Sequence, residues 1–348
     1  MRTCKKTLLW IWAFVILCGC LNQKAAMKIK KDVSMYRFPS HNAEVIRQIK
    51  RQEPVDLILR YGSWCLIQVQ QEIGYIDCEA LPLKRLEGKL SNKTVILDAG
   101  HGGSEAGAQY FGTMEKDINQ VYTTKVAQVL EKQGINVILT RKQDQTTHLY
   151  TRSSIANLVA LLSLYLQNPE SKSKQELESY MDELQNIILQ DPKFTPPLYQ
   201  KNIESNAINA RLQRLLDLTS QVQDIPFVSI HSNSTPSTAK KRKGLELILT
   251  DETISEFYPG YGTTYDMDQR KRLRDALLEA IKKETEIPLR SPYSGNYAIL
   301  RETSIPAILI EIGYLNHEEE HQNLIDPRYQ TKLTKAIGQG IEQWLAES

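Results

Sequence analysis

Four side chains that can bind metal or transfer protons stand where apolar segments begin or end. His101 lies in a glycine-rich loop directly after the apolar run 95–97, and His231 ends a second apolar run. Glu311 ends a third run, and Glu115 opens an amphipathic segment. Two histidines and two carboxylates in such positions match a zinc hydrolase, in which three residues bind the metal and one moves protons. Each also has a simpler interpretation, because a lone histidine can be structural and Glu115 can stabilise a helix N-terminus.

The segments between these residues must bring the four side chains together. The run 95–97 is short and bounded by glycine, which is typical of a strand buried on both faces. Further strands are predicted at residues 135–139, 227–230, 244–250, 297–301 and 307–311. Helices are predicted at residues 115–133, 149–166, 268–284 and 329–345. This alternation predicts an α/β fold with a doubly wound, mostly parallel sheet and flanking helices, whose site lies at the C-terminal edge of the strands.

Short motifs in a fixed order carry a resemblance to a known family. Over residues 94–346 the chain is similar to the zinc-dependent N-acetylmuramoyl-L-alanine amidases of bacterial cell walls. The motifs are Asp98-Ala99-Gly100-His101-Gly102-Gly103, Glu115-Lys116-Asp117, Thr140-Arg141, Arg152 with Ala156-Asn157, Ser229-Ile230-His231-Ser232-Asn233 and Glu311-Ile312-Gly313-Tyr314. Ala99, Ser232 and Tyr314 stand where the family has Pro, Ala and Phe. None of these changes removes a group that the reaction needs.

The resemblance implies a role for each of the four side chains. One Zn²⁺ per chain would be held by His101, Glu115 and His231, and an open position would remain for water. Glu311 would take the proton of that water and return it to the leaving nitrogen. The substrate would be peptidoglycan, cut between N-acetylmuramic acid and the L-alanine of its stem peptide. Such cleavage serves wall remodelling or the separation of daughter cells.

Five further polar residues near the motifs are interpreted less directly. Arg152 and Asn157 match family positions and are expected to support the site. Asn233 and Arg301 are expected to line the substrate groove. Glu105 shares the loop of His101 and is expected to face solvent.

The first 20 residues are predicted to be a lipoprotein signal peptide. A basic start and a short apolar stretch lead to Leu17-Cys18-Gly19-Cys20, which resembles a bacterial lipobox with Cys20 as the lipidated residue. Cys18 is unusual at its position, and an uncut signal anchor is the alternative. The chain would then work on the periplasmic side of the cell envelope, with a lipid anchor in the membrane. By resemblance to Gram-negative lipoproteins, Leu21 after the cysteine favours the outer membrane.

Residues 21–85 are predicted to form a small all-β domain that resembles bacterial SH3-like modules. Its short strands are expected at residues 45–49, 54–59, 64–69 and 73–78. Such modules often bind wall peptides, and a rigid spacer is the alternative. A linker at 86–93 leads to the amidase catalytic domain, residues 94–348.

Cys65 and Cys78 fall on neighbouring predicted strands of this domain. A tight turn would place them opposite each other, and an oxidising compartment would permit a disulfide between them. A one-residue register slip would instead put the two side chains on opposite faces of the sheet. The sequence therefore predicts a disulfide that depends on the strand register.

A helical insertion at about residues 160–224 separates two of the family motifs. Its predicted helices, at residues 173–190 and 200–221, carry many carboxylates and one apolar side. Some related amidases hold a helix across the metal until a protein activator removes it, so the insertion is a candidate gate. The alternative is an extra helical lobe packed beside the sheet.

The overall composition is that of an ordinary soluble surface. A net charge of +2 with 24% charged residues gives no reason to expect binding to nucleic acid. Two rival functions remain open from the sequence. One is a zinc peptidase that cuts a stem-peptide bond, and the other is a non-enzymatic wall-binding lipoprotein.

Overall fold

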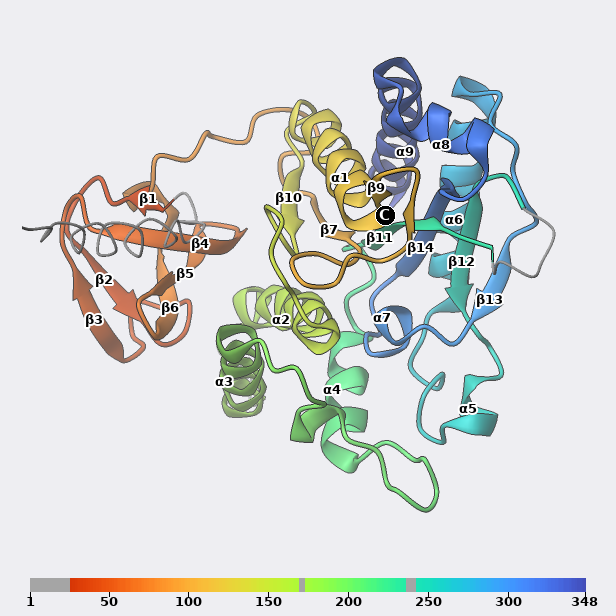
Figure 1. Cartoon of the computed structure of the whole chain (residues 1–348). Helices are drawn as coiled ribbons and strands as arrows, with labels where there is room; N and C mark the ends of the chain where they lie inside the picture. Colours follow the sequence, from red (N-terminus) through yellow and green to blue (C-terminus); the bar gives the residue numbers. More distant parts are fainter. Residues whose placement is uncertain (1–25, 169–172, 236–241) are drawn as a thin grey trace, which may run out of the picture.

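The computed structural model describes residues 26–168, 173–235 and 242–348, which form an all-β unit followed by a larger α/β unit (Figure 1). The predicted signal peptide and Cys20 lie outside these residues. Among the residues that the structure describes, no helix is both long and apolar enough to span a membrane.

The α/β unit is built on one six-stranded, mostly parallel sheet with the strand order β10-β7-β11-β14-β12-β13. Neighbouring pairs from β10 to β14 run parallel, as does the pair β12–β13, whereas β12 is antiparallel to β14. The strands are β7 (Thr94–Ala99), β10 (Asn136–Leu139), β11 (Phe227–Asn233), β12 (Glu246–Thr250), β13 (Tyr293–Gly295) and β14 (Ala307–Tyr314). This confirms the predicted mixed α/β architecture with a mostly parallel central sheet.

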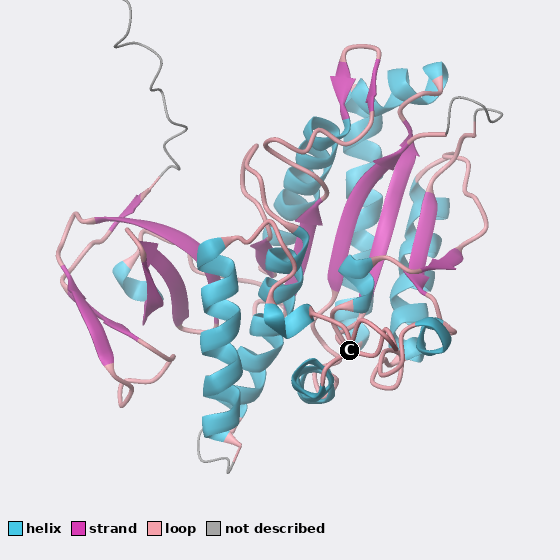
Figure 2. Cartoon of the chain, turned by 60° about the horizontal axis from the view of Figure 1, so that its bottom comes forward, coloured by secondary structure: helices cyan, strands magenta, loops and turns pink. Residues whose placement is uncertain are grey.

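Helices cover both faces of this sheet (Figures 1 and 2). Along β7, Val95 and Leu97 pack into a core with α1, α6 and α9, whereas Ile96 points to a second core with α2, α3 and α4. Both faces are therefore buried, which explains the continuous apolar run. The helices are α1 (Glu115–Glu131), α2 (Leu149–Gln167), α3 (Lys174–Gln190), α4 (Ala210–Thr219), α5 (Ile254–Phe257), α6 (Met267–Glu284), α7 (Ala298–Arg301), α8 (Glu318–Ile325) and α9 (Pro327–Glu347). A small hairpin, β8 (Gln109–Tyr110) with β9 (Thr113–Met114), precedes α1.

The N-terminal unit consists of six strands with the order β1-β4-β5-β6-β2-β3. They are β1 (Met27–Lys28), β2 (Val33–Tyr36), β3 (Val45–Ile49), β4 (Pro54–Tyr61), β5 (Trp64–Val69) and β6 (Glu72–Asp77), followed by the 3₁₀ turn η1 (Cys78–Ala80). Ile29, Met35, Ile49, Ile67 and Ile76 fill its core. All pairings between neighbouring strands are antiparallel.

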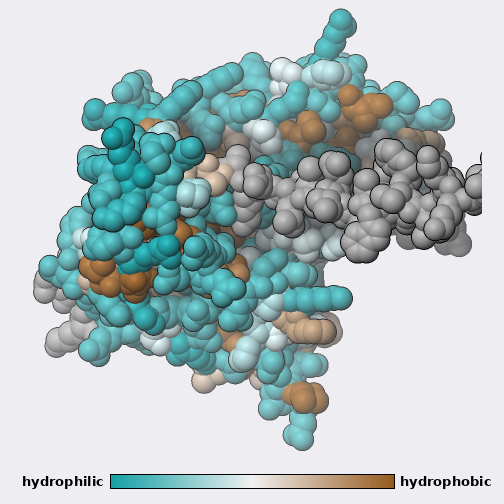
Figure 3. Space-filling model, turned by 60° about the vertical axis from the view of Figure 1, so that its left-hand side comes forward, coloured by the Kyte–Doolittle hydropathy of each residue, from teal (hydrophilic) through white to brown (hydrophobic). Residues whose placement is uncertain are grey.

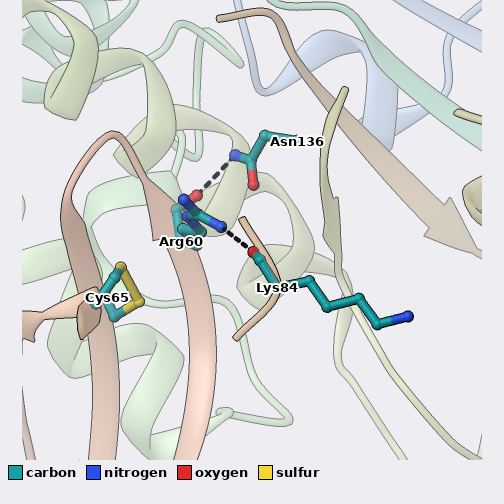
Figure 4. The surroundings of a disulfide bond; sticks show 5 residues. Arg60, Cys65, Lys84 and Asn136 are labelled. Carbon is teal, nitrogen blue, oxygen red and sulfur yellow. Dashed lines mark hydrogen bonds between the residues drawn. A yellow bond between two sulfur atoms is a disulfide. The ribbon is translucent and has the colours of Figure 1, made fainter. Parts of the chain in front are cut away.

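The predicted pairing of Cys65 with Cys78 is present as a disulfide, with the two Cα atoms 5.1 Å apart (Figure 4). The expected direct opposition of the two residues was wrong, because Cys65 lies opposite Ile76 in the β5–β6 ladder. Cys78 lies two residues further along, in η1. An offset of two residues keeps a side chain on the same face of the sheet, so the two sulfur atoms still meet.

The N-terminal unit packs directly against the α/β unit through a shared hydrophobic core. Trp64 and Tyr75 of the N-terminal unit belong to the core that contains Tyr165 of α2. Asn136 Nδ2 donates to the carbonyl oxygen of Arg60 at 2.8 Å, and Figure 4 shows this contact beside the disulfide. In Figure 3, which brings this side of the molecule forward, the coloured surface is mainly hydrophilic and its hydrophobic patches are small and separate.

The helical insertion joins the two units. On α3, Leu177, Met181 and Leu184 are buried in the shared core. Asp182 of the same helix forms an ion pair with Arg37 of the N-terminal unit, with the two atoms 3.0 Å apart. Glu176 and Glu183 of α3 form ion pairs with α4, whereas Glu178 accepts a hydrogen bond from Tyr165 of α2. The insertion thus has the form of a helical lobe packed beside the sheet.

Two predicted elements were wrong in type or extent. The apolar run 297–301 is the short helix α7 and not a strand, because a run this short does not distinguish a strand from a buried helix. The helix predicted at residues 200–221 begins only at Ala210. The side chain of Asn202 accepts from the backbone of Glu204 at 3.0 Å and so closes a turn there, while Asn209 caps the helix. The 3₁₀ turn η2 (Pro197–Tyr199) precedes this stretch.

Replacing both Cys65 and Cys78 with alanine should lower the free energy of unfolding by about 3 kcal/mol, because a cross-link over a loop of this length restricts the unfolded chain. Urea unfolding under non-reducing conditions measures the change, and wild-type protein in reducing agent is the control. In a variant that lacks Cys4, Cys18 and Cys20, unfolded and non-reduced protein should release no free thiol. Two titrating thiols would contradict the pairing.

Candidate metal centre

The four side chains singled out by type and spacing line one pocket at the C-terminal edge of the parallel strands. His101 follows β7, His231 lies in β11 and Glu311 in β14, while Glu115 is the first residue of α1. The pocket has a volume of about 540 Å³, which suits part of a large substrate or a small ligand. His231 and Glu311 are register partners on adjacent strands, so the sheet itself sets their spacing.

Three of these residues form a group that could hold a metal ion. The ligand atoms of His101, Glu115 and His231 all lie within 4.8 Å of one another. Glu115 Oε1 is 3.2 Å from His101 Nε2 and 3.1 Å from His231 Nδ1. Two imidazole nitrogens and one carboxylate oxygen around a common point, open on one side to a pocket, are the donor set of catalytic zinc sites.

Glu115 is held in place by backbone and amide donors. Its Oε2 accepts from the backbone of Ala108 at 2.9 Å, and its Oε1 accepts from Ser232 N and Asn119 Nδ2, each at 3.3 Å. Burial alone would raise the pKa of Glu115, but the two neighbouring histidines lower it well below its usual range. The carboxylate is therefore ionised and pre-oriented before any cation arrives.

The loop that carries His101 has an unusual backbone conformation. His101 has a φ of 59°, in the left-handed region that few residues other than glycine adopt. Its Nδ1 is 2.9 Å from Glu105 Oε1, which leaves Nε2 facing Glu115. Glu105 is exposed, as expected, but it also orients the histidine ring in the way that carboxylates outside a metal site commonly do.

Two glycines allow the ligand side chains to approach the loop. A Cβ at Gly100 would lie 2.1 Å from His231 Cε1, so no side chain fits there. A Cβ at Gly107 would lie 2.6 Å from Glu115 Oε2, and the φ of 67° at this glycine favours no other residue. The glycine-rich loop thus leaves room for the three side chains to meet.

Glu311 differs from Glu115, which lines the same pocket. It is 8% exposed, and its Oε2 has no hydrogen-bond partner among the described residues. Burial raises the pKa of Glu311 well above its ordinary value, and the nearby carboxylates of Glu115 and Glu246 raise it further. A buried carboxyl group without a partner is costly for stability, so a role in chemistry is the better explanation.

A buried ion pair fixes the turn from β7 into the histidine loop. Arg152 Nη1 lies 2.6 Å from Asp98 Oδ1, and Arg152 Nη2 donates to the carbonyl oxygen of His101 at 2.6 Å. Ser229 and Thr140 also donate to Asp98. Burial would raise the pKa of Asp98, but Arg152 and these two hydroxyl groups lower it. Arg152 is therefore placed to support the site, as the motif suggested.

The other predicted site residues divide into those at the pocket and those away from it. Asn233 lines the pocket, and its Nδ2 donates to Glu246 at 3.0 Å. Arg301 does not line it, because its guanidinium turns to Glu302 at 3.0 Å and stacks over Tyr258. A contact of Arg301 with the substrate therefore stays a prediction. Asn157 is buried away from the pocket, where it donates to the carbonyl of Glu302 at 2.8 Å and supports the fold around α7.

Sequence reasoning missed Glu246 and gave no role to Arg141, although Arg141 belongs to the Thr140-Arg141 motif. Glu246 of β12 is the register partner of Glu311, is 3% exposed, and binds Arg290 at 2.6 Å and Tyr314 OH at 2.8 Å. A charged residue inside an apolar strand was the available signal, the same one that marked Glu311. Arg141 Nη2 donates to the carbonyl oxygen of Gly100 at 3.0 Å and so helps to fix the loop that carries His101.

No described residue of the candidate gate reaches the pocket. None of the described residues of α3 lines it; its wall comes from the histidine loop, the starts of α1 and α2, the ends of β11 and β14, and α7. The structure therefore favours the interpretation of the insertion as a helical lobe.

Comparison with known proteins decides the family. The model of a family described as N-acetylmuramoyl-L-alanine amidase matches residues 95–163 and 166–343. This chain belongs to that family. It is an N-acetylmuramoyl-L-alanine amidase and acts on the peptidoglycan of the cell wall.

Relatives and solved structures resemble this amidase over most of its length. It is 23% identical to "Probable cell wall amidase LytH" of Staphylococcus epidermidis over 332 residues, which cover 91% of this chain and 84% of the relative. Among solved structures, an N-acetylmuramoyl-L-alanine amidase from Clostridium difficile 630 has a TM-score of 0.48 at 24% identity, covering 74% of this chain and 98% of that one. The CwlD amidase from Clostridioides difficile, in complex with the GerS lipoprotein, has a TM-score of 0.45 at 25% identity and covers 74% of this chain and 100% of that one.

Arg152→Met should destabilise the amidase by about 3–5 kcal/mol at neutral pH, because it leaves the Asp98 carboxylate buried without its cation. In the wild type the folded pKa of Asp98 is lowered, so the pair contributes stability above the unfolded pKa and loses it as pH falls through the folded pKa. In the variant the pKa of Asp98 rises instead, and the destabilisation should shrink between pH 7 and pH 4. Urea unfolding at the two pH values measures both effects.

The matched control is Arg152→Met combined with Asp98→Asn, which removes both charges. This double variant should be more stable at pH 7 than Arg152→Met alone and should show a weaker dependence on pH. Equal stability of the single and double variants at pH 7 would rule out the ion pair as the source of the effect.

Proposed function

We propose that this amidase uses one bound Zn²⁺ to hydrolyse the amide bond between N-acetylmuramic acid and the L-alanine of the stem peptide. One observation carries the proposal. The ligand atoms of His101, Glu115 and His231 lie within 4.8 Å of one another, in the same pocket as Glu311, whose Oε2 has no hydrogen-bond partner among the described residues. A structural cluster would have no reason to leave Glu311 without a partner.

The residues present fit a zinc ion. The donors are two histidines and one carboxylate, which Zn²⁺ prefers over the all-oxygen sets of Mg²⁺ or Ca²⁺. Gly100 and Gly107 leave the space around them free of side chains. Glu105 holds Nδ1 of His101 and so presents the other nitrogen for coordination.

The positions of the metal ligands and of Glu311 suggest how the amide bond would be hydrolysed. When bound, Zn²⁺ would polarise the scissile carbonyl and lower the pKa of the attacking water. Glu311 accepts the proton of that water and donates it to the leaving amide nitrogen. Its buried setting suits both tasks, because a raised pKa makes the protonated form a useful acid near neutral pH. Asn233 and Tyr297 line the same pocket and are placed to contact the substrate.

The proposed domain organisation assigns the remaining parts of the chain. Residues 1–20 are a lipoprotein signal peptide, 21–85 an SH3-like domain, 86–93 a linker and 94–348 the amidase domain, with an insertion at about 160–224. The six antiparallel strands between Met27 and Asp77 support the SH3-like assignment. Lipidation at Cys20 would place the enzyme on the periplasmic side of the cell envelope, with the sequence favouring the outer membrane. The role in wall remodelling or daughter-cell separation belongs to the same proposal.

Mass spectrometry of products from purified sacculi tests the bond that is cut. An amidase releases whole stem peptides with a free N-terminal L-alanine, and the glycan strands keep their lactyl carboxyl groups. Release of shortened peptides would instead indicate a zinc peptidase. Chelation should stop the release in either case, and added Zn²⁺ should restore it.

Glu311→Gln should retain zinc but lower the rate of wall hydrolysis by about 10²–10⁴-fold, because it removes the proton carrier and leaves the ligands in place. His101→Ala should lose both zinc and activity. Metal analysis of the purified variants, paired with dye release from labelled sacculi, separates the two effects. Turnover near the wild-type level in Glu311→Gln would sink the mechanism.

Gly100→Ala should lower zinc affinity, because its Cβ would press His231 out of position from 2.1 Å away. Gly112→Ala is the matched control, since a Cβ there meets no atom within 4 Å and only backbone strain remains. Competition with a chelating dye measures the affinity. We expect a loss of at least tenfold for the first variant and wild-type affinity for the second; similar losses in both would contradict the steric argument.

A further inference from the structure

A buried carboxylate that the proposed mechanism does not use lies next to Glu311. Glu246, the first residue of β12, is 3% exposed and is the antiparallel register partner of Glu311. Register partners in an antiparallel pair point to the same face of the sheet, so Glu246 lies on the face from which Glu311 enters the pocket. Glu246 itself does not line the pocket, so any role that it has in the reaction is indirect.

Three donors from three different parts of the chain hold Glu246. Asn233 Nδ2 donates to its Oε2 at 3.0 Å, and Tyr314 OH donates to its Oε1 at 2.8 Å. Arg290, in the segment that leads into β13, forms an ion pair with the same Oε1, with the two atoms 2.6 Å apart. The guanidinium compensates the buried charge of the carboxylate. The other two donors are the last residues of β11 and β14.

The contact with Tyr314 depends on an irregularity in the β11–β14 ladder. His231 pairs with Glu311 in this ladder. Two residues later Asn233 pairs with Tyr314, so β14 has one extra residue at this place. In a regular strand Glu311 and Tyr314 would point to opposite faces of the sheet. The bulge, in which Gly313 has a φ of 149°, instead brings the Tyr314 hydroxyl to the carboxylate opposite Glu311.

The hydroxyl group of Tyr314 is also a departure from the family motif. Tyr314 stands where the family has phenylalanine, which has no group that could donate. This chain therefore holds Glu246 with one more hydrogen bond than phenylalanine would allow. An added donor to a carboxylate beside the pocket indicates that the orientation of Glu246 matters.

Of the three donors, Asn233 connects Glu246 to the pocket, because its side chain lines the pocket wall. Its Oδ1 accepts from Ser234 N at 2.7 Å, and its Nδ2 gives one N–H to Glu246. An ionised carboxylate only accepts hydrogen bonds, so Glu246 determines which end of the Asn233 amide carries the N–H groups. The second N–H of Nδ2 is then left for an acceptor in the pocket.

We propose that Glu246 is a positioning residue of the amidase, which orients the Asn233 amide so that its second N–H donates to a carbonyl oxygen of the substrate. Tyr314 and Arg290 fix Glu246 for this task. Glu246 contributes no atom to the reaction and acts through Asn233. The contact between Asn233 and the substrate rests on the proposed function.

Steady-state kinetics of the full zinc-loaded protein on soluble, uncross-linked glycan strands that carry stem peptides test the proposal. Glu246→Gln should raise KM about tenfold and leave kcat within about twofold, because a glutamine amide accepts either orientation of Asn233. Tyr314→Phe removes one of the three bonds and should raise KM about threefold. Metal analysis and urea unfolding of each variant show separately whether zinc or the fold is lost.

A double-mutant cycle tests whether Glu246 acts through Asn233. Asn233→Ala should raise KM about tenfold, and adding Glu246→Gln to it should cause no further change. The matched control is a second Tyr–Glu pair, in which Tyr165 OH donates to Glu178 at 2.9 Å and neither residue lines the pocket. Tyr165→Phe should leave KM and kcat as they are. Additive effects in the cycle, or an unchanged KM in Glu246→Gln, would overturn the proposal.

Nuclear magnetic resonance of the ¹⁵N-labelled protein gives a measurement without substrate. One side-chain amide proton of Asn233 should exchange slowly with solvent in the native protein and at least tenfold faster in Glu246→Gln, because its hydrogen bond is weakened. Equal exchange rates in the two proteins would contradict the positioning role. This measurement needs no turnover, so failure of the proposed function would show separately, as absent amide cleavage by the native protein.

Discussion

The buried contact between Asp98 and Arg152 is the interaction on which the rest of the metal centre depends. Asp98 ends the apolar part of β7, and Arg152 reaches it from α2 to bind its carboxylate and two carbonyl oxygens of the following turn. Burying either charge without the other would be costly for stability, so the N-terminal part of α2 must pack against the end of β7. Because the same guanidinium holds the carbonyl of His101, that meeting also sets the left-handed turn that presents the histidine.

The pocket shifts the pKa values of Glu115 and Glu311 in opposite directions. Glu115 lies among histidines and backbone donors, which favour the ionised form and suit a metal ligand. Glu311 lies against the apolar sheet and beside the carboxylate of Glu246, which favours the protonated form and suits proton transfer. In the proposed mechanism, these opposite pKa shifts suit Glu115 to the role of metal ligand and Glu311 to that of acid–base group.

The insertion has a structural meaning that connects the two units. Its helix α3 pairs with Arg37 of the N-terminal strands and packs into the core that Trp64, Tyr75 and Tyr165 share. The N-terminal unit is therefore held in a fixed orientation relative to the metal pocket. The described residues of the insertion thus join the two units and do not line the pocket.

The sequence by itself determined the chemistry and most of the framework. His101, Glu115, His231 and Glu311 were recognisable because each polar residue stands at the end of an apolar run or at a helix start, and the periods of these runs predicted the strands and helices. Local patterns cannot report contacts between distant segments. Only the tertiary structure showed that Glu246 lies opposite Glu311, that Arg301 turns away from the pocket to Glu302, and that α3 packs against the N-terminal unit. The disulfide shows the same limit on a smaller scale, since the two cysteines could be paired from their neighbouring strands, but their offset was decided by the register of the folded sheet.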